Sequence, residues 1–230
     1  MAAELLMIPS GEQFINIHSH RKAVSADEWV LRNAFHVLDG YQIGRLNYAV
    51  SVGVHPWYID SDFEQNIAQI ESLLQLNNVL ALGEIGLDRA VNIDFKLQKH
   101  VFEIQLQLAE EYNKPVIIHS VRTYSDLAPY LKKIKVPVIL HQYRGNETQT
   151  QQFISLENVF FSFGKDLIFN KKVKTIFQSM PLNRIFLETD VFAMNIQDIY
   201  KQATILSGKD IGILKEYLYQ SFLRIFSNSK

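Results

Sequence analysis

The chain has 230 residues, of which 47% are hydrophobic, so one domain spanning residues 1–230 can bury a substantial core. It contains no cysteine, which excludes disulfides, thiolate nucleophiles, iron-sulfur clusters and sulfur-ligated zinc. Any bound metal must therefore be held by nitrogen and oxygen atoms. With 23 Lys and Arg against 24 Asp and Glu, there is no general positive field that would attract a polyanion, so such attraction has to be local.

The amino-terminal stretch and the hydropathy pattern bear on location. No run approaches the roughly 18 apolar residues required to cross a bilayer. Glu4 precedes the first short apolar stretch, where a secretory signal would carry basic residues. We therefore expect a soluble, cytoplasmic protein without a membrane partner.

Short apolar runs rich in β-branched and aromatic residues recur along the chain and end in polar residues. Such runs are typical of strands that are buried on both faces. The predicted strands cover residues 14–18, 30–36, 46–55, 79–84, 115–119, 137–141, 158–164 and 184–190. The second and third are the weakest, and an alternative is that residues 30–38 end a helix that begins near Ser25.

Helical periodicity fills most of the intervals between these strands. The predicted helices cover residues 62–74, 94–113, 124–134, 148–156, 169–179, 196–208 and 210–226. Alternating strands and helices favour parallel pairing, and eight such units suit an α/β fold of the (β/α)8 TIM-like barrel type better than an open sheet. Residues 39–45 are too few for a helix, so the barrel is expected to be slightly degenerate, with a helix missing between strands two and three.

His18 and His20 form a His-x-His pair at the end of the first predicted strand. Side chains two residues apart in a strand point to the same side, so both imidazoles can address one point in space. The pair can chelate a metal, although such pairs also arise by chance.

Other titratable residues stand where later predicted strands end. They are Glu84 on the fourth strand, His119 on the fifth, His141 on the sixth and Asp190 on the eighth. In a parallel barrel these carboxyl ends meet on one rim, which is where the active sites of this architecture lie. Any one of them alone would be unremarkable as a water-facing residue, but together they predict a shared site.

Four imidazoles and two carboxylates suit a borderline divalent ion such as zinc, manganese or iron. Six ligands exceed what one tetrahedral ion requires. We therefore expect two divalent ions about 3.5–4 Å apart, sharing one carboxylate and activating a water for hydrolysis.

Several longer motifs carry a resemblance to a known family. They are FINIHSH, VGVHPWY, ALGEIGLD, QKHVFEIQLQLAEEYNKPVIIHS, LHQYRG and RIFLETD. Together they resemble the TatD family of metal-dependent deoxyribonucleases, within the amidohydrolase-like barrels, over nearly the whole chain. The resemblance implies a TIM-like barrel, hydrolysis of phosphodiester bonds, often from a 3′ DNA end, and no organic cofactor or required protein partner. The expected substrate is DNA, either single-stranded or at a 3′ end.

The family pattern also implies roles for the six candidate ligands. One ion would be held by His18, His20, Glu84 and Asp190, and the other by Glu84, His119 and His141. Glu84 would bridge the two ions, and Asp190 would also orient or deprotonate the attacking water. The ions themselves are expected to be Mg, Mn or Zn.

The chain departs from the family pattern close to these positions. Arg21 and Lys22 follow the His-x-His pair where the family commonly has Leu and Asp. Val121 takes the place of the usual Arg, with Arg122 one residue later, and the proline of the Thr-Asp-x-Pro pattern is absent. All of these changes spare the ligands and alter the rim where a substrate would bind.

Local positive charge is therefore expected from Arg21, Lys22, Arg122 and Arg144, because guanidinium groups bind phosphate in a bidentate fork. His55, Arg122 and Arg144 are the predicted substrate contacts. The alternative for the arginines is that they face bulk water, and for His55 that it positions a metal ligand.

Further residues have a structural interpretation beside a functional one. Trp57 and Tyr58 either stack on a nucleobase or, as the favoured interpretation, pack over the barrel mouth. Gly86 is expected to permit a tight turn or close approach of substrate. His36 and His100 are expected to be structural or solvent-facing.

Three functions remain open on the sequence alone. The first is a two-metal deoxyribonuclease with 3′-5′ exonuclease character. The second is an amidohydrolase-like enzyme acting on a small ester, amide or other non-nucleic substrate with the same metal centre. The third, a scaffold protein without catalytic activity, is disfavoured because the full ligand set is present.

Overall fold

The computed structural model describes residues 8–34 and 40–226, and its centre is a sheet of parallel strands. The strands are β1 (Phe14–Ser19), β2 (Glu28–Asn33), β3 (Val50–Val52), β4 (Val79–Asp88), β5 (Val116–Val121), β6 (Val138–Leu140), β7 (Val159–Phe163) and β8 (Ile185–Leu187). Each strand pairs with the next along the chain, so their spatial order is their sequence order. A bridge between Ser19 and Asp190 brings β8 back to β1 and nearly closes the barrel. The predicted α/β barrel is confirmed.

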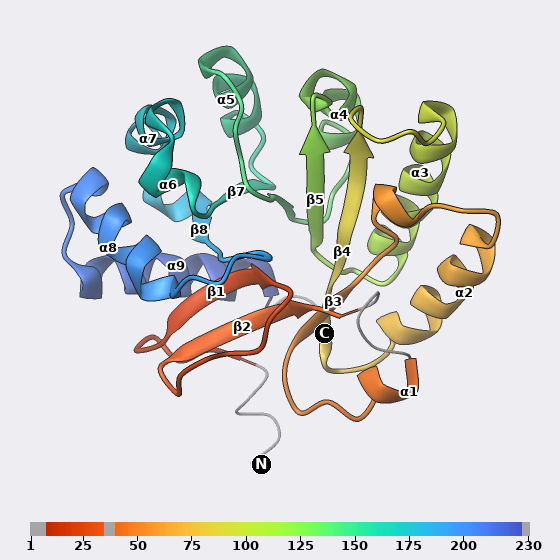
Figure 1. The fold of residues 1–230 in the computed structure, drawn as a ribbon, viewed down its shortest axis with the longest axis horizontal. Coiled ribbons are helices and arrows are strands. Elements are labelled where there is room, and N and C mark those ends of the chain that lie inside the picture. Colours follow the sequence, from red (N-terminus) through yellow and green to blue (C-terminus); the bar gives the residue numbers. More distant parts are fainter. Residues whose placement is uncertain (1–7, 35–39, 227–230) are drawn as a thin grey trace.

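The helices lie around the outside of the strands (Figure 1). Those between β3 and β8 are η2 (Pro56–Tyr58), α2 (Phe63–Leu74), α3 (Phe95–Glu111), α4 (Tyr124–Leu131), α5 (Glu147–Ile154), α6 (Asp166–Phe169), α7 (Lys171–Gln178) and η3 (Leu182–Arg184). Two helices follow β8, α8 (Ile196–Ser207) and α9 (Ile211–Phe226). Their ends follow from local chemistry: Asp94 caps α3 by accepting from Leu97 N, and α8 ends at Gly208 in a left-handed conformation.

The core divides according to the period of two along each strand. In β5, Val116 and Ile118 pack outward against the helices, whereas Ile117 packs inside the barrel. The inner cluster includes Trp29 of β2 and Phe222 of α9, whose ring centroids are 4.9 Å apart. Helix α9 therefore packs against the interior of the barrel, and the other helices cover its outer surface.

The structure changes several predicted boundaries. Strand β2 begins at Glu28 and is extended, so the alternative of a helix across this region is wrong for its described residues. His36 lies outside the described residues. Strand β3 is shortened to three residues, and β4 runs four residues beyond Glu84 to Asp88. Between β2 and β3 the described residues contain only the single turn α1 (Gly40–Ile43), so the predicted degenerate crossover lacks a full helix but is not entirely without helical structure.

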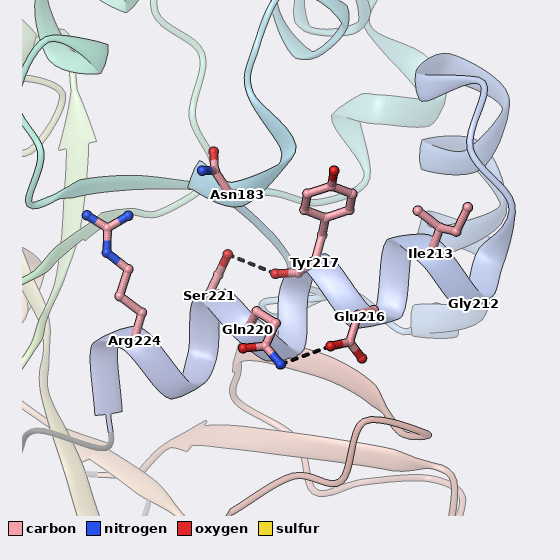
Figure 2. Close-up of a pocket in the computed structure, with 8 residues that line it drawn as sticks. All are labelled: Asn183, Gly212, Ile213, Glu216, Tyr217, Gln220, Ser221 and Arg224. Carbon is pink, nitrogen blue, oxygen red and sulfur yellow. Dashed lines mark hydrogen bonds between the residues drawn. The ribbon is translucent and has the colours of Figure 1, made fainter.

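A hollow of about 620 Å³ runs along the outer side of α9 (Figure 2). Its lining includes Asn183, which precedes β8, together with Ile213, Tyr217 and Arg224 of α9. Because Asn183 lies ahead of its strand, the hollow is at the amino end of the barrel. The candidate ligands all lie at the other end.

No helix in the described parts of the chain is long and apolar enough to span a membrane.

Candidate metal centre

The carboxyl ends of the strands bring the six predicted ligands to one rim. His18 and His119 lie within β1 and β5, and Glu84 lies in the middle of β4. The other three follow their strands: His20 after β1, His141 after β6 and Asp190 after β8. A cavity of about 250 Å³ opens there and is lined by five of the six, together with His55, while His18 is completely buried beside it.

One side of the centre joins the His-x-His pair to two carboxylates. Glu84 Oε2 lies 3.2 Å from His18 Nε2 and 3.8 Å from His20 Nε2. Asp190 Oδ1 lies 3.6 Å and 3.5 Å from the same two nitrogens. These four residues each offer one ligand atom within 4.8 Å of the others, a geometry that can hold a metal ion.

The other side of the centre gathers three imidazoles around Glu84 Oε1. The distances are 2.9 Å to His119 Nδ1, 3.3 Å to His55 Nε2 and 3.3 Å to His141 Nε2. His55, Glu84 and His119 form a second group of mutually close ligand atoms. Glu84 belongs to both groups, and the structure thus brings His55 as close to the second group as the predicted ligand His141.

The contacts of the outer ring nitrogens distinguish His55 from His141. The backbone N–H of Trp57 donates to His55 Nδ1 at 3.1 Å, so in the neutral ring the hydrogen resides on Nε2, the atom that faces Glu84. His141 has the opposite arrangement, because its Nδ1 lies 2.8 Å from Glu188 Oε1 and its Nε2 faces Glu84. A carboxylate behind the ring favours the hydrogen on Nδ1 and leaves the inner nitrogen free to bind a metal.

The buried, unsatisfied imidazole of His18 indicates whether the site fits a metal. The side chain is completely buried, and neither ring nitrogen has a hydrogen-bond partner within the described structure. Leaving buried polar atoms unsatisfied costs free energy unless another partner is provided. A divalent cation between Glu84 and Asp190 would provide a partner for Nε2, the ring nitrogen that faces both carboxylates. Donors of nitrogen and carboxylate oxygen are those that zinc, manganese and iron accept.

The pKa values show how strongly the charges of the site are coupled. Burial opposes ionisation of Glu84, but His141, His119 and His18 outweigh it and hold the pKa of Glu84 well below its ordinary value. Burial also opposes protonation of His119, yet its hydrogen bonds to Asp88 and Glu84 raise its pKa to about 9. The site is therefore built for positive charge, whether carried by protons or by metal.

His55 differs from these rings. Burial lowers the pKa of His55, and the neighbouring carboxylate of Glu84 only partly offsets that effect. The ring is thus neutral near pH 7, and its Nε2 is a hydrogen-bond donor.

Comparison with known proteins identifies the family. A family model described as TatD related DNase matches residues 33–206. The chain belongs to this family. A metal-dependent hydrolase of Haemophilus influenzae is 28% identical over 79% of this chain and 78% of that protein. A protein of Erwinia tasmaniensis named 3′-5′ ssDNA/RNA exonuclease TatD is 27% identical over 77% of each chain.

The fold is also that of a solved TatD homologue. The crystal structure of YjjV from Escherichia coli has a TM-score of 0.83 and 21% identity, and the match covers 95% of this chain and 99% of that one. The present chain is accordingly a metal-dependent hydrolase of the TatD type. Its histidine and carboxylate cluster is able to bind metal.

Two carboxylates of this TatD family member were missed by the sequence analysis. Asp88 Oδ2 accepts from His119 Nε2 at 3.0 Å and from Trp57 Nε1 at 2.6 Å, and Glu188 lies behind His141. Burial opposes ionisation of Asp88, but the bonds from His119 and Trp57 lower its pKa to about 2. A period of two was the available signal, since Asp88 follows Glu84 by four residues and Glu188 precedes Asp190 by two.

The predicted substrate contact Arg144 is engaged with other protein groups. Its Nε lies 2.6 Å from Asp166 Oδ2, and its guanidinium donates to Gln142 Oε1 at 3.2 Å. Gln142 in turn donates from Nε2 to Asp190 Oδ2 at 3.0 Å. Arg144 thus fixes the amide that orients Asp190, although about half of its own side chain stays exposed.

The other positively charged side chains at the rim make fewer contacts with protein groups. Arg122 directly follows β5 in a left-handed conformation, and its exposed side chain has no hydrogen bond or ion pair with any described residue. Arg21 is likewise exposed, and within the described parts of the chain its one hydrogen bond runs from its backbone N–H to Ser19 Oγ. Lys22 lies 5.6 Å from the ring centroid of Tyr48. Arg122 is therefore the better placed of the two arginines predicted to contact substrate.

Gly86 lies inside β4 and not in a turn, which corrects the sequence interpretation. Its φ is +151°, and a Cβ there would stand 2.0 Å from the carbonyl oxygen of His119. The absent side chain makes room for the backbone of β5, and thereby brings His119 within reach of Glu84. It does not make room for substrate.

We expect Gly86→Ala to destabilise the fold by about 3 kcal/mol or more, through backbone strain and overpacking together. Gly208→Ala is the matched control, because Gly208 also has a positive φ but no atom lies within 4 Å of the added Cβ. The free energy of unfolding in urea measures both effects. Equal losses for the two variants would show that φ alone, and not the contact with β5, decides the cost.

Proposed function

We propose that this TatD family member is a two-metal deoxyribonuclease that removes nucleotides from the 3′ end of single-stranded DNA. The observation that carries the proposal is the position of Glu84, whose two oxygens belong to two different groups of potential ligands. A shared carboxylate is the usual bridge in two-metal phosphoesterases.

The proposed ligands follow from the ring geometry. His18, His20, Glu84 and Asp190 hold one ion. For the second ion we propose Glu84, His119 and His141, because both rings have a carboxylate behind them and a nitrogen facing Glu84. His55 is assigned to the substrate, since its Nε2 carries the hydrogen.

The protein groups then divide the chemistry. When bound, divalent ions supply positive charge to the phosphoryl oxygens and lower the pKa of water. Asp190, fixed by Gln142, accepts the proton of the attacking water at its carboxylate. His55 Nε2 donates to a phosphate oxygen, and Arg122 supplies a guanidinium fork to a neighbouring phosphate.

The size of the cavity supports action at a chain end. Its volume of about 250 Å³ lies just below the range of about 300–1,000 Å³ typical of small-molecule sites. Such a cavity admits one terminal unit of a polymer and excludes a duplex. The Erwinia relative named as a single-strand exonuclease supports the same substrate class.

The test incubates the purified protein and divalent metal with two 5′-labelled oligonucleotides, one with a free 3′ end and one with a protected 3′ end. The measurement is the shortening of each oligonucleotide. We expect stepwise loss from an unprotected 3′ end in Mg²⁺, Mn²⁺ or Zn²⁺, and no cleavage after chelation. Asp190→Asn is expected to lower the rate at least ~10²-fold, because it removes the proton acceptor. If only carboxyl esters or amides are hydrolysed in a parallel panel, the phosphodiesterase proposal is wrong. If no metal is bound under any condition, a catalytic role is wrong.

A further inference from the structure

Two aromatic side chains stand exposed at the edge of the metal cavity. Trp57 and Tyr58 belong to η2, the short helix that follows His55, and their exposed fractions are 53% and 50%. Both line the cavity that contains Glu84 and His119. As the sequence interpretation favoured, the rings pack at the barrel mouth, with centroids 5.1 Å and 5.9 Å from that of His55, yet about half of each ring residue stays exposed.

The exposed indole of Trp57 and the backbone that carries both rings are nevertheless held in place. The indole N–H of Trp57 donates to Asp88 Oδ2 at 2.6 Å, and its backbone N–H donates to His55 Nδ1 at 3.1 Å. The backbone N–H of Tyr58 donates to the carbonyl oxygen of His55 at 2.9 Å. The indole is therefore already ordered in the free protein. A ligand that stacks on it has little further loss of side-chain entropy to offset.

A third exposed apolar side chain lines the cavity, on the loop that follows β8. Val191 directly follows Asp190, is 55% exposed and lines the same cavity. Trp57, Tyr58 and Val191 are thus exposed hydrophobic side chains around one opening, within reach of the groups proposed to act on phosphate. A flat, apolar ligand suits such a surface better than a sugar or a phosphate does.

We propose that Trp57 and Tyr58 form a subsite for one unpaired nucleobase of the terminal nucleotide, a role that rests on the nuclease function proposed above. An aromatic face accepts any base, because every base has a π face. A base inside a duplex already stacks on both neighbours and is not available. The subsite therefore selects single-stranded ends without reading sequence.

A pair of oligothymidylates tests the subsite, one ending in a 3′ thymidine and one in a 3′ abasic residue. For the native protein we expect kcat/KM to be about tenfold higher with the terminal base, the value typical of one stacked base. Trp57→Ala is expected to remove this preference. Trp57→Phe keeps an aromatic face but loses the indole N–H, and is expected to keep most of it.

Tyr217→Ala is the matched control. Tyr217 is also exposed, at 41%, but lies in the hollow along α9 at the other end of the barrel (Figure 2). It is expected to leave the preference unchanged. If Trp57→Phe loses as much as Trp57→Ala, the bond to Asp88 and not stacking is responsible, and the inference is wrong. If the native protein cleaves the two oligothymidylates with equal kcat/KM, the inference is also wrong, while the nuclease function stays intact.

Binding without cleavage separates the two proposals. The chain has two tryptophans, and Trp29 is 5% exposed against Phe222. Quenching of tryptophan fluorescence by a phosphorothioate oligothymidylate therefore reports on Trp57. We expect the affinity measured by quenching to be about tenfold lower for the oligonucleotide with the abasic end. In Trp57→Phe the quenching is expected to disappear, because the reporting indole is gone. Quenching that is the same for both ends contradicts the subsite even if no DNA is ever cleaved.

Discussion

Glu84→Gln is expected to lower kcat for phosphodiester hydrolysis at least ~10³-fold and to reduce the amount of bound metal. The substitution keeps the size of the side chain and removes its charge. Both groups of ligand atoms lose the carboxylate that they share, and the histidines on either side lose their common anionic partner. Among the described residues, Glu84 is the one member that the two groups have in common.

The measurement is metal content after dialysis, together with turnover of an end-labelled oligonucleotide. Glu216→Gln is the control, because Glu216 is an exposed glutamate on α9 and lines the hollow at the other end of the barrel. It is expected to retain native metal content and native activity. Full activity of Glu84→Gln would sink the shared-carboxylate mechanism, and full metal content with no activity would place the role of Glu84 in proton transfer.

The metal rim was predictable from the sequence because a parallel barrel converts strand order into spatial proximity. Once eight strands are recognised, residues at their carboxyl ends must meet, whatever their separation along the chain. The pair His18 and His20 needed only the two-residue period of a strand. Placement of Glu84, His119 and Asp190 followed from the same rule.

What the sequence did not supply was the set of contacts between side chains on different loops. Arg144 resembles a phosphate-binding group until Asp166, 22 residues later, is seen to bind its guanidinium. The sequence analysis predicted His141 as a metal ligand and His55 as a substrate contact, but the contacts that distinguish their ring nitrogens, a backbone N–H on one and Glu188 behind the other, come only from the structure. Such contacts depend on loop geometry, for which hydrophobic periodicity carries no information.

Strand ends were also poorly predicted, for a physical reason. The run 79–84 stops at a charged residue, and a charge normally marks the edge of a buried strand. In the structure β4 continues to Asp88, because Glu84 and Asp88 both have histidine partners inside the protein. A buried charge with a partner costs less than an unpaired one, so polarity alone does not end a strand.

Without metal, the protein is expected to lose stability as the pH rises from 6.5 to about 9. The pKa of His119 is about 9 in the folded chain against 6.5 for a free histidine. The folded state therefore binds the proton more tightly than the unfolded state, and the resulting stability is complete below pH 6.5 and gone above pH 9. The difference between the two pKa values corresponds to about 3 kcal/mol as an upper limit.

Asp88 acts in the opposite direction at low pH. Its pKa is about 2 in the folded chain against 3.8 when free, so its contribution is present above pH 3.8 and disappears as the pH falls through about 2. Between these limits, from about pH 4 to pH 6.5, the two contributions coexist. The metal-free protein should therefore be most stable within that window.

Metal reverses the trend on the alkaline side. Ligand histidines must be deprotonated, so protons compete with the ion, and metal affinity rises as the pH increases. Thermal unfolding in a chelator and in excess Mn²⁺, at intervals from pH 6 to pH 9, measures the effect. The midpoint should fall with pH in the chelator and hold or rise in Mn²⁺, because binding to the folded state alone stabilises it.

The metal-free Glu84→Gln variant provides the control for this behaviour. Glu84 is one of the two carboxylates that raise the pKa of His119, so neutralising it should flatten the fall between pH 6.5 and 9. A native midpoint that is flat or rising in chelator over that range would contradict the proposed charge balance of the rim. A fall of equal size in both proteins would assign the pH dependence to Asp88 or to groups elsewhere in the chain, and not to Glu84. The expected pattern links two properties of one site, because Glu84 both raises the pKa of His119 in the free protein and is the carboxylate proposed to hold metal once the proton leaves.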